Sequence, residues 1–158
     1  MTDAALLVAH LAAKGLRVTT AESCTGGLVA ASLTNVPGSS HVFEEGIVTY
    51  SNNAKIRLLG VRISTLEAHG AVSEEIGREM AQGALTGSGA DIAISVTGIA
   101  GPGGSELKPE GRVCFAIAMK ANLSSHTKEF GAIGRANVRQ AACDHALMLI
   151  AQASGFAP

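Results

Sequence analysis

Residues 16–27 read LRVTTAESCTGG, an apolar strand-like run that leads through small hydroxyl residues into paired glycines. An alanine-rich helix pattern, Leu28 to Leu33, follows at once. Small residues at a strand-to-helix junction leave backbone N–H groups uncovered at the positive end of the helix. The stretch therefore predicts an α/β fold with an anion-binding turn.

A second glycine-rich turn, Thr97 to Gly104, follows the apolar run Ile92 to Val96. Loops at the carboxyl ends of strands in an open α/β sheet gather around one crevice, so the two turns predict a shared pocket for a phosphorylated small molecule. Neither turn contains GxGxxG or GxxxxGK[ST], which excludes a dinucleotide fingerprint and a P-loop. For either turn alone, the alternative that its glycines only permit tight turns stays open.

Composition narrows the class of protein. The 158 residues are expected to form one domain over residues 1–158, and 47% hydrophobic residues argue against disorder. A net charge of -1 and 3% aromatic residues argue against nucleic-acid binding. Because the chain has no apolar run of about 20 residues and no basic signal-peptide start, we expect a cytoplasmic protein without a membrane partner.

The cysteines and histidines give no sign of a metal site. Three cysteines occur without CxxC spacing, and the five histidines are scattered. We therefore expect no metal and no cofactor. Self-association into a homo-oligomer is expected for so apolar a chain.

Periodicity and turn residues place helices and strands in alternation. Ala4 to Lys14 is a helix pattern ended by Gly15, and the last three strands run almost consecutively. This order predicts α/β layers around a mixed sheet with an antiparallel edge. The predicted helices cover residues 4–14, 25–34, 54–59, 64–69, 73–86 and 135–153, and the predicted strands cover 16–21, 43–50, 91–96, 111–120 and 124–130.

Lys55 is a candidate catalytic base. It lies in the first turn of its predicted helix, where a cation is unfavourable, and a residue that breaks a local rule is often functional. The helix end and desolvation would both lower its pKa. Neutral Lys55 would then activate the hydroxyl of Ser40 or Ser39, with Tyr50 relaying a proton or orienting the lysine. The alternative is a solvated lysine beside turn-forming serines.

Three further residues have open roles. Cys24 is a rival nucleophile near a helix N-terminus, although no histidine is near and a buried apolar role is favoured. Glu22 is either a general base or a cap on local N–H groups. Arg135, at the start of the last helix, either reaches a phosphate or substrate acid, or is solvated.

Several motifs in fixed order resemble the CinA C-terminal-domain family over nearly the whole chain, in what looks like its stand-alone form. They are Thr20 to Gly27, Pro37-Gly38-Ser39-Ser40, Gly46 to Lys55 with Tyr50-Ser51-Asn52, Gly70 to Ser73, and Ser95 to Pro102. The resemblance implies a three-layer α/β/α sandwich with a mixed, mostly parallel sheet of about five strands, close to the anticodon-binding domains. It also implies a nicotinamide-nucleotide amidohydrolase, which converts nicotinamide mononucleotide to the acid and ammonia in pyridine nucleotide recycling.

Carried across by position, Ser40 resembles the family nucleophile, and Lys55 and Tyr50 match its activating partners. The resemblance implies that the residues lining the nucleotide pocket are Ser23, Thr25, Gly26, Gly27, Thr97, Gly98, Gly101 and Arg135. The segment Gly103 to Gly111 departs from the family pattern. The competing hypothesis is a non-catalytic nucleotide-binding regulatory module, which would use the same glycine turns without turnover.

Overall fold

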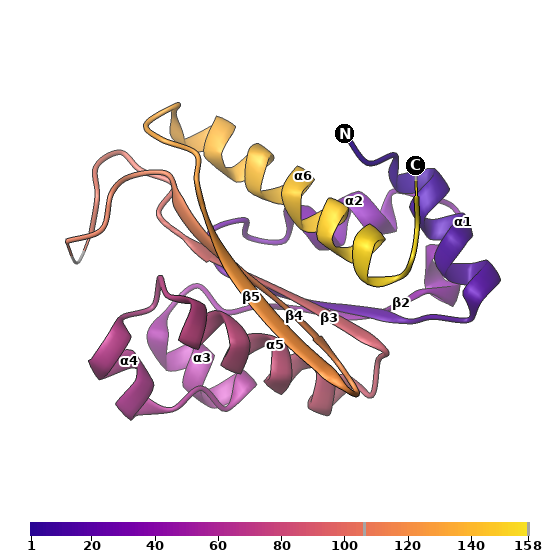
Figure 1. Ribbon diagram of the computed structural model, residues 1–158, viewed down its shortest axis with the longest axis horizontal. Helices are drawn as coiled ribbons and strands as arrows, with labels where there is room; N and C mark the ends of the chain where they lie inside the picture. The colour runs from indigo at the N-terminus through magenta and orange to yellow at the C-terminus, as the bar shows by residue number, and fades with distance from the viewer. Residues whose placement is uncertain (106, 158) are drawn as a thin grey trace.

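A five-stranded mixed sheet forms the middle layer of the computed structural model, which describes residues 1–105 and 107–157 (Figure 1). The strand order is β2-β1-β3-β4-β5, with β1 parallel to β2 and β3, and β4 antiparallel to β3 and β5. β1 is buried along its whole length, as expected for a central strand of an α/β sheet. The strands are β1 (Val18–Glu22), β2 (Phe43–Val48), β3 (Ile92–Gly98), β4 (Arg112–Met119) and β5 (Asn122–Glu129).

Local sequence sets the ends of the helices in the described chain. Asp3 accepts two backbone N–H groups at the start of the first helix, and Gly15, with φ of 66°, ends it. Ser51 and Ser73 cap two later helices in the same way. The helices are α1 (Ala4–Lys14), α2 (Leu28–Thr34), α3 (Asn52–Leu59), α4 (Ile63–His69), α5 (Glu74–Ser88) and α6 (Arg135–Ala153), with a 3-10 turn η1 (Ser39–His41).

Helices cover both faces of the sheet (Figure 1). α1, α2 and α6 lie on one face, where Leu11, Phe115 and Ile150 belong to one apolar core. α3, α4 and α5 lie on the other face, where Ile76 and Met80 belong to a second. None of the helices in the described residues is both long and apolar enough to span a membrane.

The direction of the strands decides where a site can form. β1, β2 and β3 are mutually parallel, so the segments that follow them emerge at the same side of the sheet, where the carboxyl ends of these strands lie. These segments begin at Ser23, Thr49 and Ile99. The turn η1 precedes β2 and lies at the amino ends of the parallel strands. Phe43 pairs with the start of β1, and Val48 pairs with its end.

The α/β/α architecture and the mixed sheet with an antiparallel edge confirm the predicted fold class. The bounds predicted for α1 and α6 agree with the structure. The predicted start of α2 at Thr25 is wrong, because Gly26 and Gly27 have φ of 59° and 106° and the helix begins only at Leu28. The single-domain assignment over residues 1–158 stays a prediction, and residues 106 and 158 fall outside the described chain.

We predict that Gly83→Ala destabilises the fold, because a Cβ atom at this position of α5 would overlap the carbonyl oxygen of Leu59 in α3. Overpacking of this kind lowers the free energy of unfolding by about 1–3 kcal/mol. Gly87→Ala is the matched control, since nothing lies within 4 Å of its added Cβ. Urea denaturation followed by circular dichroism checks both variants, and equal midpoints would contradict the prediction.

Candidate active site

A buried lysine joins the ends of two strands. Lys55, in α3, is 1% exposed, and its Nζ donates to Ser23 Oγ at 3.0 Å and to the Thr49 carbonyl oxygen at 2.8 Å. Ser23 follows β1 directly, and Thr49 follows β2. Burial lowers the pKa of Lys55, because desolvation penalises the ammonium. An amine with a lowered pKa therefore lies within hydrogen-bonding distance of a serine hydroxyl.

This pair opens onto a cavity of about 340 Å³ at the carboxyl edge of the parallel strands. The volume lies within the range typical of small-molecule sites. Its walls are formed by the second glycine turn, the segments after β1 and β2, and the loop before α5. The lining residues are Ser23, Cys24, Tyr50, Asn52, Lys55, Ala71, Val72, Thr97, Gly98, Ile99, Ala100, Gly101, Pro102, Gly103, Gly104, Ser105 and Arg135.

Arg135 connects three segments around this cavity. Its Nη2 donates to Tyr50 Oη at 2.6 Å, and its Nη1 donates to the Gly101 carbonyl oxygen at 2.5 Å. Tyr50 is 60% exposed, and its hydroxyl pairs with Arg135, whereas the Thr49 carbonyl holds Lys55. A guanidinium at the cavity rim suits an anionic group of a ligand.

Glu22 acts as a helix cap. Its fully buried carboxylate accepts the backbone N–H groups of Gly27, Val29 and Ala30 at 3.2, 3.0 and 3.1 Å. These N–H groups belong to the positive end of α2, which the carboxylate therefore satisfies from within the chain. The sequence left two roles open for Glu22, and the structure supports the role of a cap.

The capping carboxylate overturns the anion-binding turn predicted at the start of α2. Thr25 is completely buried, and the cavity lining does not include Thr25, Gly26 or Gly27. The N–H groups expected to face an anion are already taken by Glu22. Among the residues predicted to bind substrate, the structure brings Ser23, Thr97, Gly98, Gly101 and Arg135 together at the cavity.

The predicted contact between Ser40 and Lys55 is wrong. Ser40 lies exposed in η1, before the start of β2, whereas Lys55 follows the end of that strand. Six residues of extended chain separate the two ends by roughly 20 Å. Ser39 lies in the same turn and is separated from Lys55 in the same way. The hydroxyl that does meet Lys55 is that of Ser23.

Two rim segments are fixed by their own contacts. Thr97 Oγ1 donates to the Ala71 carbonyl oxygen at 2.9 Å, which ties β3 to the loop before α5. In the segment that departs from the family pattern, the Glu110 carboxylate accepts the N–H of Gly103. Residue 106 of this segment lies outside the described residues.

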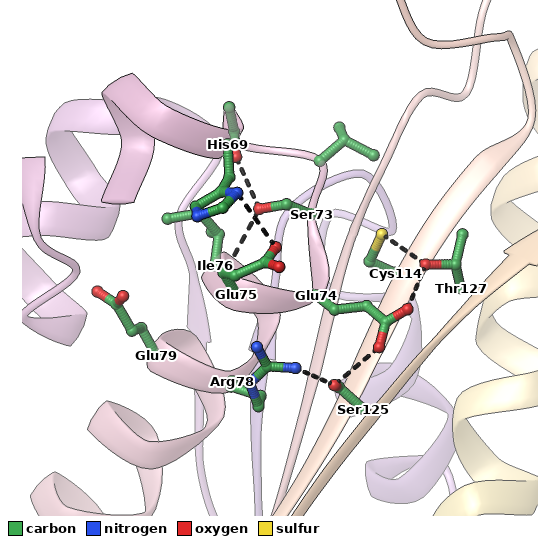
Figure 2. A network of polar contacts seen from close by, with 12 residues as sticks. His69, Ser73, Glu74, Glu75, Ile76, Arg78, Glu79, Cys114, Ser125 and Thr127 are labelled. Atoms are coloured by element: carbon green, nitrogen blue, oxygen red, sulfur yellow. Dashed lines mark hydrogen bonds and ion pairs between the residues drawn. The ribbon is translucent and has the colours of Figure 1, made fainter. Parts of the chain in front are cut away.

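A polar network supports the wall from outside the cavity (Figure 2). Glu74, in the first turn of α5, accepts hydrogen bonds from Ser125 and Thr127 of β5, both at 2.9 Å. Arg78 Nη1 donates to the same serine at 2.6 Å. These bonds fix the start of α5 against β5, and the wall residues Ala71 and Val72 lie just before that start.

Sequence reasoning missed the place of two residues near the turn that follows β1. Asn52 lines the cavity, although the sequence indicated no role for it beyond its place in the Tyr50-Ser51-Asn52 motif. Arg139 donates to the carbonyl oxygens of Cys24 and Thr25. Arg139 could have been found from its spacing. It lies four residues after Arg135, which places both side chains on one side of the predicted helix.

The chain is similar to known proteins over most of its length. Residues 2–154 match the family model described as the CinA C-terminal domain. The nicotinamide-nucleotide amidohydrolase PncC of Escherichia coli K12 is 52% identical over 143 residues, 90% of this chain and 87% of that protein. A CinA-like protein of Chloroherpeton thalassium is 62% identical over 118 residues, 74% of this chain.

Solved structures show the same fold. The competence/damage-inducible protein CihA of Agrobacterium tumefaciens has a TM-score of 0.87 and 47% identity, with 96% of each chain covered. A CinA superfamily protein of Klebsiella pneumoniae 700603 has a TM-score of 0.92 and 38% identity, covering 96% of this chain and 95% of that one. The chain spans only 28%, 27% and 35% of the length of three curated relatives that it matches.

We predict that Cys24 is chemically inert, because burial raises the pKa of its thiol to about 12. Burial also raises the pKa values of Cys114 and Cys143, so at pH 7.5 the three buried thiols stay protonated. Native protein treated with iodoacetamide should gain no mass, whereas urea-unfolded protein gains three adducts. Rapid native alkylation at Cys24 would restore it as a rival nucleophile.

Proposed function

The chain belongs to the CinA C-terminal domain family, and from this premise we propose that it is a nicotinamide-nucleotide amidohydrolase. The proposed reaction hydrolyses the carboxamide of nicotinamide mononucleotide to nicotinic acid mononucleotide and ammonia, in pyridine nucleotide recycling. The 52% identity with PncC of Escherichia coli supports the substrate. The single observation that carries the chemistry is the 3.0 Å contact between Lys55 Nζ and Ser23 Oγ at the cavity.

In the proposed mechanism, Ser23 takes the nucleophile role that the family resemblance placed at Ser40. Neutral Lys55 accepts the proton of Ser23 Oγ while this oxygen attacks the carboxamide carbon. The C–N bond breaks, the lysine returns the proton to the leaving nitrogen, and ammonia departs. Water then attacks the serine ester with the same amine as base, which releases the acid and restores Ser23. The sum is amide plus water giving acid plus ammonia.

The electrostatics of the site favour this use of Lys55. Desolvation lowers its pKa, so a larger fraction of the amine is unprotonated near neutral pH than for an exposed lysine. The opposing influence of a Cys24 thiolate is absent there, because the pKa of that thiol is about 12. The Thr49 carbonyl oxygen fixes the amine in place.

Substrate binding is proposed for the residues at the rim. Arg135 would meet the nucleotide phosphate, since it is the guanidinium at the cavity. Thr97, Gly98 and Gly101 would contact the ribose side, and Tyr50 would release its bond to Arg135 when the phosphate arrives. Binding energy from this remote part of the substrate positions the carboxamide against Ser23.

The other expectations from sequence stay proposals. They are a cytoplasmic location, a homo-oligomeric assembly, and a small-molecule nucleotide as partner without nucleic acid. The competing function, a non-catalytic nucleotide-binding module, would use the same cavity. Calorimetric titration with nicotinamide mononucleotide, run beside an ammonia assay, separates the two, because a regulatory module binds without turnover.

We predict that Ser23→Ala lowers ammonia release from nicotinamide mononucleotide at least about 1000-fold, as loss of a serine nucleophile does in other enzymes. Ser40→Ala is the matched control and keeps near wild-type turnover, because Ser40 lies exposed at the far end of β2. Steady-state kinetics of purified proteins provide the measurement. Turnover that survives Ser23→Ala but not Ser40→Ala would reverse the assignment.

We predict that turnover rises with pH as Lys55 loses its proton. Because its pKa is lowered, the rise begins below the ordinary lysine value of 10.5. Lys55→Met removes the base and costs about 100- to 10,000-fold in kcat. A pH–rate profile of kcat checks the prediction, with circular dichroism at each pH as control for folding. A wild-type rate that does not change with pH would refute the role of the amine.

A further inference from the structure

The turn that carries Ser23 is held by a side chain from a remote element. Arg139, in α6, donates from Nε to the Cys24 carbonyl oxygen at 3.0 Å and from Nη2 to the Thr25 carbonyl oxygen at 3.2 Å. These are the first two carbonyls after the Ser23 residue. The guanidinium is half-buried, and unlike Arg135 it does not line the cavity.

The shape of the guanidinium matters for this contact. Its N–H groups lie in one plane in a rigid fork, so two of them on consecutive carbonyls fix two consecutive peptide planes. The backbone of Gly26 packs against the same group, since a Cβ atom there would lie 3.1 Å from Arg139 Nη2. An ammonium has no such fork and fixes the two planes less well.

The remaining contacts of the turn leave the Cys24 carbonyl to Arg139. Ser23 N–H donates to the Val96 carbonyl oxygen at 2.9 Å, and Gly26 N–H donates to the Ser23 carbonyl oxygen at 3.0 Å. Glu22 holds the start of α2. The Thr25 carbonyl oxygen also accepts the N–H of Leu28 at 3.1 Å. The Cys24 carbonyl oxygen accepts from Arg139, so the orientation of the Cys24 peptide depends most on the guanidinium.

We propose that Arg139 is a positioning residue for the reaction at Ser23. By holding the Cys24 and Thr25 carbonyl oxygens, it fixes the turn so that Ser23 Oγ stays against Lys55 Nζ and faces the cavity. The inference rests on the proposed function for its chemistry. Because Arg139 touches the turn and not the cavity, its loss should lower kcat and leave KM almost unchanged.

The test compares Arg139→Ala and Arg139→Lys with Arg57→Ala, an exposed arginine of α3, as matched control. We expect kcat for nicotinamide mononucleotide to fall about 10- to 100-fold in Arg139→Ala, the cost of a misplacement near 1 Å, and less in Arg139→Lys. KM should stay within about threefold, and added methylguanidinium should restore part of the lost kcat. Thermal melting checks whether each variant is folded. If Arg139→Ala does not fold, the kinetics of Arg139→Lys decide whether Arg139 has the positioning role.

A second readout separates this inference from the proposed substrate. The rate at which phenylmethylsulfonyl fluoride modifies Ser23, followed by intact mass, reports the nucleophile without any nucleotide. If wild-type protein releases no ammonia but its Ser23 is modified, and more slowly in both Arg139 variants, the positioning role stands and the substrate assignment fails. Variants with wild-type kcat and modification rate, or with raised KM alone, overturn the positioning role. A wild-type Ser23 that neither turns over nor reacts overturns both.

Discussion

The amine of Lys55 and its two partners bring the separate parts of this structure to one point. Ser23 Oγ follows β1, the Thr49 carbonyl follows β2, and Lys55 itself lies in α3, so the contact forms only when the two strands are parallel and in register. A buried ammonium without such partners is strongly unfavourable. The parallel pairing, the cap at Ser51 that starts α3 and the covering layer of α5 all place one nitrogen atom beside one hydroxyl.

A second constraint comes from the carboxylate of Glu22. A helix end with open N–H groups attracts anions, and the sequence before α2 suggested this use. In the structure the chain supplies its own anion, so the start of α2 is rigid and closed to a phosphate. The cationic rim at Arg135 and the second glycine turn therefore remain for a ligand, and Ser23 remains for the proposed chemistry. The second glycine turn lines the cavity, whereas Gly26 and Gly27 of the first do not.

Sequence patterns predicted the fold because local signals agreed. Gly15 ended the predicted helix over residues 4–14, and the last three strands ran almost consecutively, so the layers and the antiparallel edge of a mixed sheet followed. The partner of Lys55 was missed, since a Ser–Lys pair is defined by distance and not by spacing. The predicted strand over residues 43–50 already separated Ser40 from Lys55 by its own length. The cap role of Glu22 was one of two open alternatives, and the contacts of Arg139 were missed, because both depend on how the turn closes.

The buried lysine also couples the chemistry to stability. Since its pKa is lower in the folded protein than in the unfolded chain, the unfolded chain binds more protons between those two pKa values, and stability rises with pH across that interval. The same loss of a proton produces the free amine that the proposed mechanism needs. A site of this kind is destabilising when Lys55 is charged, and the apolar cores on both faces of the sheet offset that cost. The protonation state that suits the base is thus also the one in which the fold is under least electrostatic penalty.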